Sequence, residues 1–231
     1  MVRSEEGELL GGGAQRRVVR VGSAVRIPVH PRSAYIAELL SHLERVGFDS
    51  APRWLGRTDD GDELLSYVEG TVPDQPPYNL DDEQLAAAGR LVRRFHDAVA
   101  GTPLCQGAET LCHGDLGPHN TVFRNGLPVA IIDWDDDVGP GSRAVDFADA
   151  VWGFADVTSD SVPVAEQARR VEVMCGVYPG MTPATVVAEL RAQFQRARRN
   201  HADAGRTGPL EVFEGLIAWM NRHGPTIATD R

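Results

Sequence analysis

Lysine is absent from this sequence of 231 residues, and all 23 basic side chains are arginines. Any role that usually falls to a lysine must therefore be taken by arginine or be missing. Long apolar runs are absent too, because none approaches the ~20 residues that span a bilayer. We therefore expect no membrane partner. Residues 1–10 are acidic and lack the apolar stretch of a signal peptide, so we expect a cytoplasmic protein.

Cysteine is scarce, and charge of one sign predominates. The three cysteines are odd in number and match no metal-binding spacing, which indicates free thiols. The net charge of −10 argues against a nucleic-acid partner and is compatible with a cationic small molecule. With 42% hydrophobic residues, the chain can form a sizeable core in one large domain or two small ones. Its oligomeric state stays open.

The first 70 residues have the pattern of a small sheet with one helix. Runs of β-branched residues at 16–22 and 24–29, split by Gly22 and Ser23, predict two strands and a turn. Residues 33–46 place apolar side chains on one helical face, with Ser33 as the expected N-cap and Gly47 as the stop. Two more strands are expected at 52–57 and 62–70.

The rest of the chain is mainly helical in pattern. Residues 72–80 contain three prolines and form a connector. A helix with acidic residues in its first turn follows, up to residue 99. Further helices are expected at 145–154, 164–178, 184–203 and 209–222. The predicted sheet precedes most of the predicted helices along the chain, which indicates an α+β fold of two lobes with a cleft between them.

Between these parts lies HGDLGPHN, residues 113–120, and thirteen residues after Asn120 comes Asp133 in IIDWDDD. The runs TVF and VAII flank Asn125-Gly126, a strong signal for a tight β-hairpin turn. In that hairpin Asn120 precedes the first strand and Asp133 follows the second. Paired strands lie about 5 Å apart, so the hairpin brings the two side chains together.

An amide oxygen beside a carboxylate suits Mg²⁺, which takes few protein ligands and completes its shell with water and phosphate. Asn120 and Asp133 are therefore the candidate metal ligands. Asp115 lies on the preceding loop, and as a carboxylate that the metal does not need it is the candidate general base.

HGDLGPHN and IIDWDD closely resemble the catalytic loop and the metal-binding segment of the aminoglycoside phosphotransferase and choline kinase-like family. Similarity extends to LLGGG and VVRVGSAVRIP near the start, LLSYVEG at 64–70, RRFHDA before the loop and GPGSRAVDFADA after it. The resemblance covers roughly residues 8–155. It implies a two-lobed protein kinase-like fold with an abbreviated N-terminal β-sheet lobe, residues 1–69, and a mainly helical C-terminal catalytic and acceptor-binding lobe, residues 70–231.

The resemblance also implies roles for particular residues. Asp115 would accept the proton of the substrate hydroxyl, while Asn120 and Asp133 would hold Mg²⁺ on the nucleotide phosphates. Gly11, Gly12 and Gly13 would form a glycine turn whose amides approach the phosphates. Backbone groups near Tyr67 and Val68 would receive the adenine. The family's phosphate-clamping lysine is replaced by Arg26, which would be oriented by Glu38.

The function implied is ATP- or GTP-dependent phosphorylation of a hydroxyl on an aminoglycoside-, amino alcohol- or sugar-like small molecule. No pocket motif in the sequence selects among these acceptors. His113 is expected to brace the loop, and His119 lies outside the motif positions. Two alternatives stay open: a catalytically silent, kinase-like nucleotide-binding protein, and a metal-dependent hydrolase with His113, Asp115 and His119 as transition-metal ligands.

Overall fold

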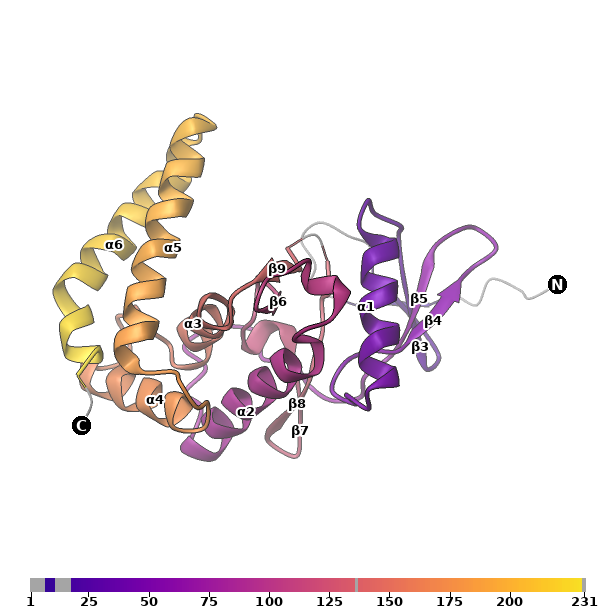
Figure 1. Ribbon diagram of the computed structural model, residues 1–231, viewed down its shortest axis with the longest axis horizontal. Coiled ribbons are helices and arrows are strands. Elements are labelled where there is room, and N and C mark those ends of the chain that lie inside the picture. Colours follow the sequence, from indigo (N-terminus) through magenta and orange to yellow (C-terminus); the bar gives the residue numbers. More distant parts are fainter. Residues whose placement is uncertain (1–6, 11–17, 136, 230–231) are drawn as a thin grey trace.

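The computed structural model describes residues 7–10, 18–135 and 137–229. The molecule is elongated, with the small sheet and helix α1 at one end and the pair α5 and α6 at the other (Figure 1). Helices α2 and α3 and strands β6, β7, β8 and β9, which lie within residues 110–141, lie between these ends. This arrangement confirms the α+β architecture, with the sheet at one end of the molecule and the long helices at the other.

The N-terminal sheet has five antiparallel strands in the order β1-β2-β3-β5-β4. Its strands are β1 Glu8–Leu9, β2 Val19–Val21, β3 Ala24–Ile27, β4 Trp54–Arg57 and β5 Glu63–Ser66. Helix α1, Ser33–Arg45, lies between β3 and β4 in the chain and buries its predicted apolar face, including Leu39 and Leu40. The predicted strands and helix of this lobe are therefore confirmed wherever the structure describes them.

Residues 103–141, which follow helix α2, Asp82–Val99, form short strands and two 3₁₀ turns. Asp81 and Gln84 form a capping box at the start of α2, each side chain bonding the other's backbone amide at 2.9 Å. After α2 come the 3₁₀ turn η1 Pro103–Cys105, β6 Thr110–Cys112, the 3₁₀ turn η2 Pro118–Asn120, β7 Thr121–Arg124, β8 Leu127–Ile131 and β9 Gly139–Gly141. Strands β7 and β8 pair with each other, and β6 pairs with β9.

Four helices complete the chain: α3 Arg143–Phe154, α4 Val164–Gly176, α5 Pro183–Asp203 and α6 Thr207–Ile227. Their apolar faces join the residues of α1 and α2 in one continuous core, in which Phe95, Phe147 and Phe194 are almost fully buried. In the described ranges, no helix combines the length and the apolarity that crossing a membrane requires.

Two sequence predictions about elements need correction, and one strand pair was not predicted. Ser33 is not the N-cap of α1; the cap is Arg32, and the hydroxyl of Ser33 instead accepts a hydrogen bond from the amide of His30 at 2.9 Å. Helix α6 continues past residue 222 through Pro225 to Ile227, and Gly224 and Ile227 on either side of this proline are buried. The strand pair β6–β9 was not predicted, because Gly139–Gly141 has the composition of a loop.

Candidate active site

The β7–β8 hairpin has the geometry that its turn residues predicted. Asn125 and Gly126 both have positive φ, at 52° and 81°, as a type I′ turn requires. Thr121 pairs with Ile131, and the amide of Ile132 donates to the carbonyl of Asn120 at 2.9 Å. Asn120 therefore lies opposite Ile132, and Asp133 is the next residue along the chain.

Asp115 and Asn120 are in direct contact across the loop. The amide Nδ2 of Asn120 donates to the side-chain Oδ2 of Asp115 and to its main-chain carbonyl, both at 2.9 Å. Asn120 is almost fully buried, whereas Asp115 is exposed toward the outside of the loop. The loop thus presents a carboxylate at its surface and anchors it on a buried amide.

The donor set fits a magnesium ion better than a transition metal. Because Nδ2 of Asn120 is engaged with Asp115, its Oδ1 is the atom left to act as a ligand. Asp133 is exposed and has a positive φ of 63°, a conformation that aspartate tolerates better than most residues. Among the described residues, no group of three His, Cys, Asp or Glu side chains could hold a metal ion. Two oxygen ligands are the kind of incomplete set that Mg²⁺ accepts when it also binds phosphate.

Buried and partly buried hydrogen bonds brace the base of the loop. His113, as expected, is a bracing residue: its Nε2 bonds the carbonyl of Ile132 at 3.0 Å, and its ring packs edge-on against Trp134. Asp146 of α3 accepts from the amide of Gly114 through Oδ1 and bonds His96 of α2 through Oδ2. The loop is therefore fixed to α2, α3 and the end of the hairpin.

His119 contacts Asp115 from the side opposite Asn120. Its Nε2 lies 3.2 Å from Oδ1 of Asp115. This hydrogen bond holds the pKa of the Asp115 carboxyl below its usual range and raises the pKa of the His119 imidazole. Asp115 is therefore ionised at neutral pH, as a residue that receives a proton must be.

Asp149 of α3 is a second carboxyl close to the loop. Burial, reinforced by the charges of Asp146 and Asp115, raises its pKa to about 8. A hydrogen bond from the amide of Leu116 opposes that rise. Asp149 is thus predominantly protonated at neutral pH, in contrast to Asp115. The sequence analysis did not single it out, because α3 reads as an ordinary amphipathic helix.

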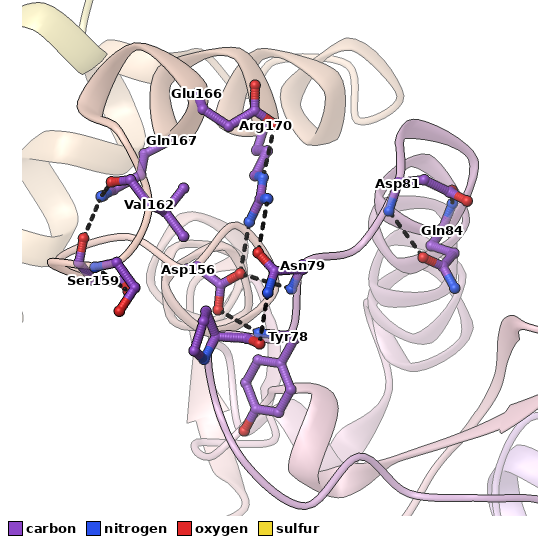
Figure 2. A network of polar contacts seen from close by, with 12 residues as sticks. Tyr78, Asn79, Asp81, Gln84, Asp156, Ser159, Val162, Glu166, Gln167 and Arg170 are labelled. Atoms are coloured by element: carbon purple, nitrogen blue, oxygen red, sulfur yellow. Dashed lines mark hydrogen bonds and ion pairs between the residues drawn. The ribbon is translucent and has the colours of Figure 1, made fainter.

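Tyr78 is held in the connector by a polar network that Figure 2 shows. The carboxylate of Asp156 accepts hydrogen bonds from the amides of Tyr78 and Asn79, at 2.8 and 3.1 Å, and from Arg170 at 2.6 Å. Burial, then the charges of Asp156 and Asp115, raise the pKa of the Tyr78 phenol. Tyr78 therefore lies within electrostatic range of Asp115.

The structure does not bring every predicted nucleotide contact to the loop. Arg26 of β3 is one-third exposed and forms an ion pair with Asp62, with Nε and Oδ2 3.4 Å apart. In the described part of the chain, no hydrogen bond or ion pair joins Arg26 to the exposed Glu38. Gly11, Gly12 and Gly13 lie outside the described residues.

Tyr67 and Val68 directly follow β5. The amide of Tyr67 donates to the carbonyl of Ser23 at 2.8 Å, and the guanidinium of Arg20 stacks on the Tyr67 ring. A cavity of about 570 Å³ lies between this segment, α2 and β8. Of the predicted site residues that the structure describes, only Val68 lines it. The cavity is therefore separate from the Asp115 loop.

These parts together define the protein kinase-like phosphotransferase fold. They are a five-stranded antiparallel sheet with one helix, a connector, and a helical lobe that carries the Asp115–Asn120 loop and the hairpin before Asp133. Comparison with known proteins agrees. Residues 100–184 match the family model described as "Phosphotransferase enzyme family". This segment contains Asp115, Asn120 and Asp133, so the predicted resemblance to the aminoglycoside phosphotransferase and choline kinase-like family is confirmed.

One individual protein is similar in sequence over part of its length. The trifolitoxin immunity protein of Rhizobium leguminosarum bv. trifolii is 35% identical over 169 residues, which cover 66% of this chain and 64% of that protein. The aligned part therefore spans about 64% of the relative's length.

Two solved structures show the same fold. The streptomycin–ATP ternary complex of APH(2″)-IIa aligns with a TM-score of 0.59 at 15% identity, over 97% of this chain and 94% of that chain. The macrolide 2′-phosphotransferase MphH of Brachybacterium faecium aligns with a TM-score of 0.57 at 16% identity, over 94% of each chain.

Proposed function

We propose that this protein is an ATP- or GTP-dependent phosphotransferase that phosphorylates a hydroxyl of a small molecule. The observation that carries the proposal is the contact between Asp115 and Asn120 next to Asp133. It combines an ionised carboxylate at the loop surface with two oxygen ligands at the end of one hairpin. Solved relatives that contain ATP or ADP support a nucleotide as co-substrate.

In the proposed mechanism, Asp115 orients the acceptor hydroxyl and receives its proton as the phosphoryl group transfers. The transition state of phosphoryl transfer is loose, so a strongly basic carboxylate is not needed and its lowered pKa is compatible with the role. Asn120 and Asp133 would hold Mg²⁺, which when bound neutralises charge on the nucleotide phosphates. The backbone of Tyr67 and Val68 would receive the base, and Gly11–Gly13 would approach the phosphates.

Arg26 would serve as the phosphate clamp. Its ion pair with Asp62 is of the solvent-exposed kind that contributes little stability, so Arg26 can exchange this carboxylate for a phosphate. Arginine also binds phosphate bidentately, in a geometry that differs from that of lysine.

A second candidate function is nucleotide binding without phosphoryl transfer. Two observations favour it: the clamp position is an arginine already paired with Asp62, and the curated relative is named as an immunity protein. The hydrolase alternative is weaker, because the described residues contain no three-ligand cluster and His113 bonds the carbonyl of Ile132.

A phosphorylation screen separates the first two candidates. The purified protein is offered Mg·ATP and Mg·GTP with an acceptor library that includes gentamicin, streptomycin, spectinomycin, hygromycin B, amino alcohols and sugars. Transfer of labelled phosphate to any of these acceptors supports the phosphotransferase. Nucleotide binding with no transfer across the whole library supports the silent protein.

Two isosteric variants then test the assigned roles. Asp115→Asn should retain the fold, Mg²⁺ and nucleotide but lower kcat by about 10²–10⁴-fold, the usual contribution of a general base. Asp133→Asn removes a charged magnesium ligand and should abolish the Mg²⁺-dependent part of nucleotide binding. Calorimetric titration with a non-hydrolysable ATP analogue, with and without Mg²⁺, measures the difference. Wild-type binding by both variants would show that the metal assignment is wrong.

A further inference from the structure

Asp115 carries one hydrogen-bond donor on each of its carboxylate oxygens. Asn120 donates to Oδ2 at 2.9 Å, and Nε2 of His119 bonds Oδ1 at 3.2 Å. Asn120 belongs to the expected catalytic motif, whereas His119 lies outside the motif positions. The second donor therefore needs its own explanation.

A carboxylate in this position needs two donors to have a defined orientation. The χ2 torsion of aspartate is broad, so the rotamer alone does not fix the plane of the carboxylate. The side chain of Asp115 is 58% exposed, and packing does not fix it either. With one donor on each oxygen the plane is set, and about two of the four lone-pair sites are still available for an acceptor hydroxyl.

The imidazole of His119 packs directly against the backbone of Gly117, and we call this contact surface the Gly117 seat. A Cβ added at Gly117 would lie 2.6 Å from Cε1 and 2.7 Å from Nδ1 of His119. The φ of Gly117 is −167°, an extended conformation that any residue adopts, so the demand for glycine is steric. Asn120 and Thr121 both bond the carbonyl of Gly117, at 3.1 and 2.8 Å, which holds the seat in place.

We infer that His119 is a positioning residue for the proposed phosphoryl transfer: seated on Gly117, its imidazole orients the carboxylate of Asp115 toward the acceptor hydroxyl. This inference rests on the proposed function. It predicts that His119 acts on the rate only through Asp115 and leaves nucleotide binding unchanged.

The first test is kinetic. One assay measures phosphate transfer from Mg·ATP to gentamicin, streptomycin, spectinomycin or hygromycin B. A second assay measures hydrolysis of Mg·ATP, in which water is the acceptor. His119→Ala should lower kcat by about 10-fold, as the loss of one hydrogen bond to a charged group implies, with the KM for ATP within 2-fold of wild type. His119→Gln keeps an N–H donor of similar reach and should recover most of the rate.

A double-mutant cycle shows whether the effect passes through Asp115. In the Asp115→Asn background, His119→Ala should have no further effect on the residual rate. An equal 10-fold loss in both backgrounds would overturn the inference, because His119 would then act independently. The matched control is His42→Ala, which removes an imidazole hydrogen bond of 2.8 Å to the carbonyl of Ala98, remote from the loop.

The second test needs no turnover and examines the seat itself. Gly117→Ala should displace the imidazole, because its methyl group would lie 2.6 Å from Cε1, and should lower the free energy of unfolding in chemical denaturation by no more than the lost His119–Asp115 hydrogen bond contributes. The same change in the His119→Ala background should lower it much less. An undiminished loss there would mean that the ring does not occupy the seat and would overturn the inference.

The outcomes distinguish the two proposals. A wild-type protein that binds ATP but transfers phosphate to none of the probes, water included, refutes the proposed function and the role of His119 with it. A wild-type protein that turns over, together with a fully active His119→Ala variant, refutes only the inference about His119.

Discussion

Nε2 of His96 lies 2.9 Å from Oδ2 of Asp146, and neither side chain is exposed to solvent. The other oxygen of Asp146 accepts from the amide of Gly114 at 3.0 Å, and Nδ1 of His96 bonds the hydroxyl of Tyr178 at 2.8 Å. One buried carboxylate thus connects α2, α3 and the first turn of the catalytic loop. The position of Asp115 depends on this connection, although no atom of His96 or Asp146 belongs to the proposed chemistry.

Replacing Asp146 with alanine should destabilise the fold by about 3 kcal/mol. The change leaves Nε2 of the fully buried His96 without its acceptor and also removes the acceptor of the Gly114 amide. A buried donor without a partner costs its full desolvation free energy. Chemical denaturation of the variant gives the difference. The control is Asp49→Ala, which breaks an exposed ion pair with Arg94 and should lower stability by less than about 1 kcal/mol. Equal losses in the two variants would contradict the bracing role of Asp146.

Arg26→Ala should raise the apparent KM for nucleotide and leave acceptor binding nearly unchanged. Arg26 is the cation at the clamp position of β3, and Asp62→Ala should have the opposite effect because it releases Arg26 from its carboxylate. Steady-state kinetics at varied ATP concentration measures both. Unchanged nucleotide affinity in a folded Arg26→Ala variant would exclude Arg26 as the clamp. Arg20, the next candidate, already bonds Glu69 at 2.6 Å and stacks on Tyr67.

Asp149 should make the protein less stable as the pH rises from about 4 to about 8. Its pKa in the folded protein is about 8, against an ordinary value of 3.8 for an aspartate side chain. In this window the unfolded chain has lost the proton that the folded protein keeps. The unfolded state therefore binds fewer protons, and the free energy of unfolding falls with pH.

Asp149→Asn keeps the shape of the side chain but removes its ionisable proton. The variant should gain about 3–4 kcal/mol relative to wild type between pH 5 and pH 8, measured by denaturation across the range. Asn in place of the exposed Asp59 is the matched control and should leave the pH dependence of wild type unchanged. If the curves of Asp149→Asn and wild type stay parallel, Asp149 is ionised in the folded protein.

Asp156→Ala should loosen the connector that carries Tyr78. The change removes the acceptor of two consecutive backbone amides and the closest partner of the buried Arg170 (Figure 2). Hydrogen exchange at the amides of Tyr78 and Asn79 should accelerate, and the free energy of unfolding should fall by about 3 kcal/mol. Glu214→Ala, which breaks an exposed pair with Arg198, is the control and should change neither quantity by much.

The sequence by itself determined the local elements and the content of the loop. Asn125 and Gly126 tolerate positive φ, so the hairpin and its pairing follow from two adjacent residues. The apolar faces of α1 and α2 and the capping box at Asp81 depend on residues no more than a few positions apart. Asp115, Asn120 and Asp133 likewise lie in one short segment, so their spacing can be read directly from the sequence.

Only the tertiary structure decided what surrounds that segment. His96 and Asp146 are 50 positions apart, Tyr78 and Asp156 are 78 apart, and nothing local to either residue specifies the partner. The raised pKa of Asp149 comes from burial, which is a property of the packed core and not of the α3 sequence. The same holds for His119: its contact with Asp115 depends on a loop folded tightly enough for the ring to lie over Gly117. The passage of α6 through Pro225 is likewise a feature of the packed structure, in which Gly224 and Ile227 on either side of the proline are buried.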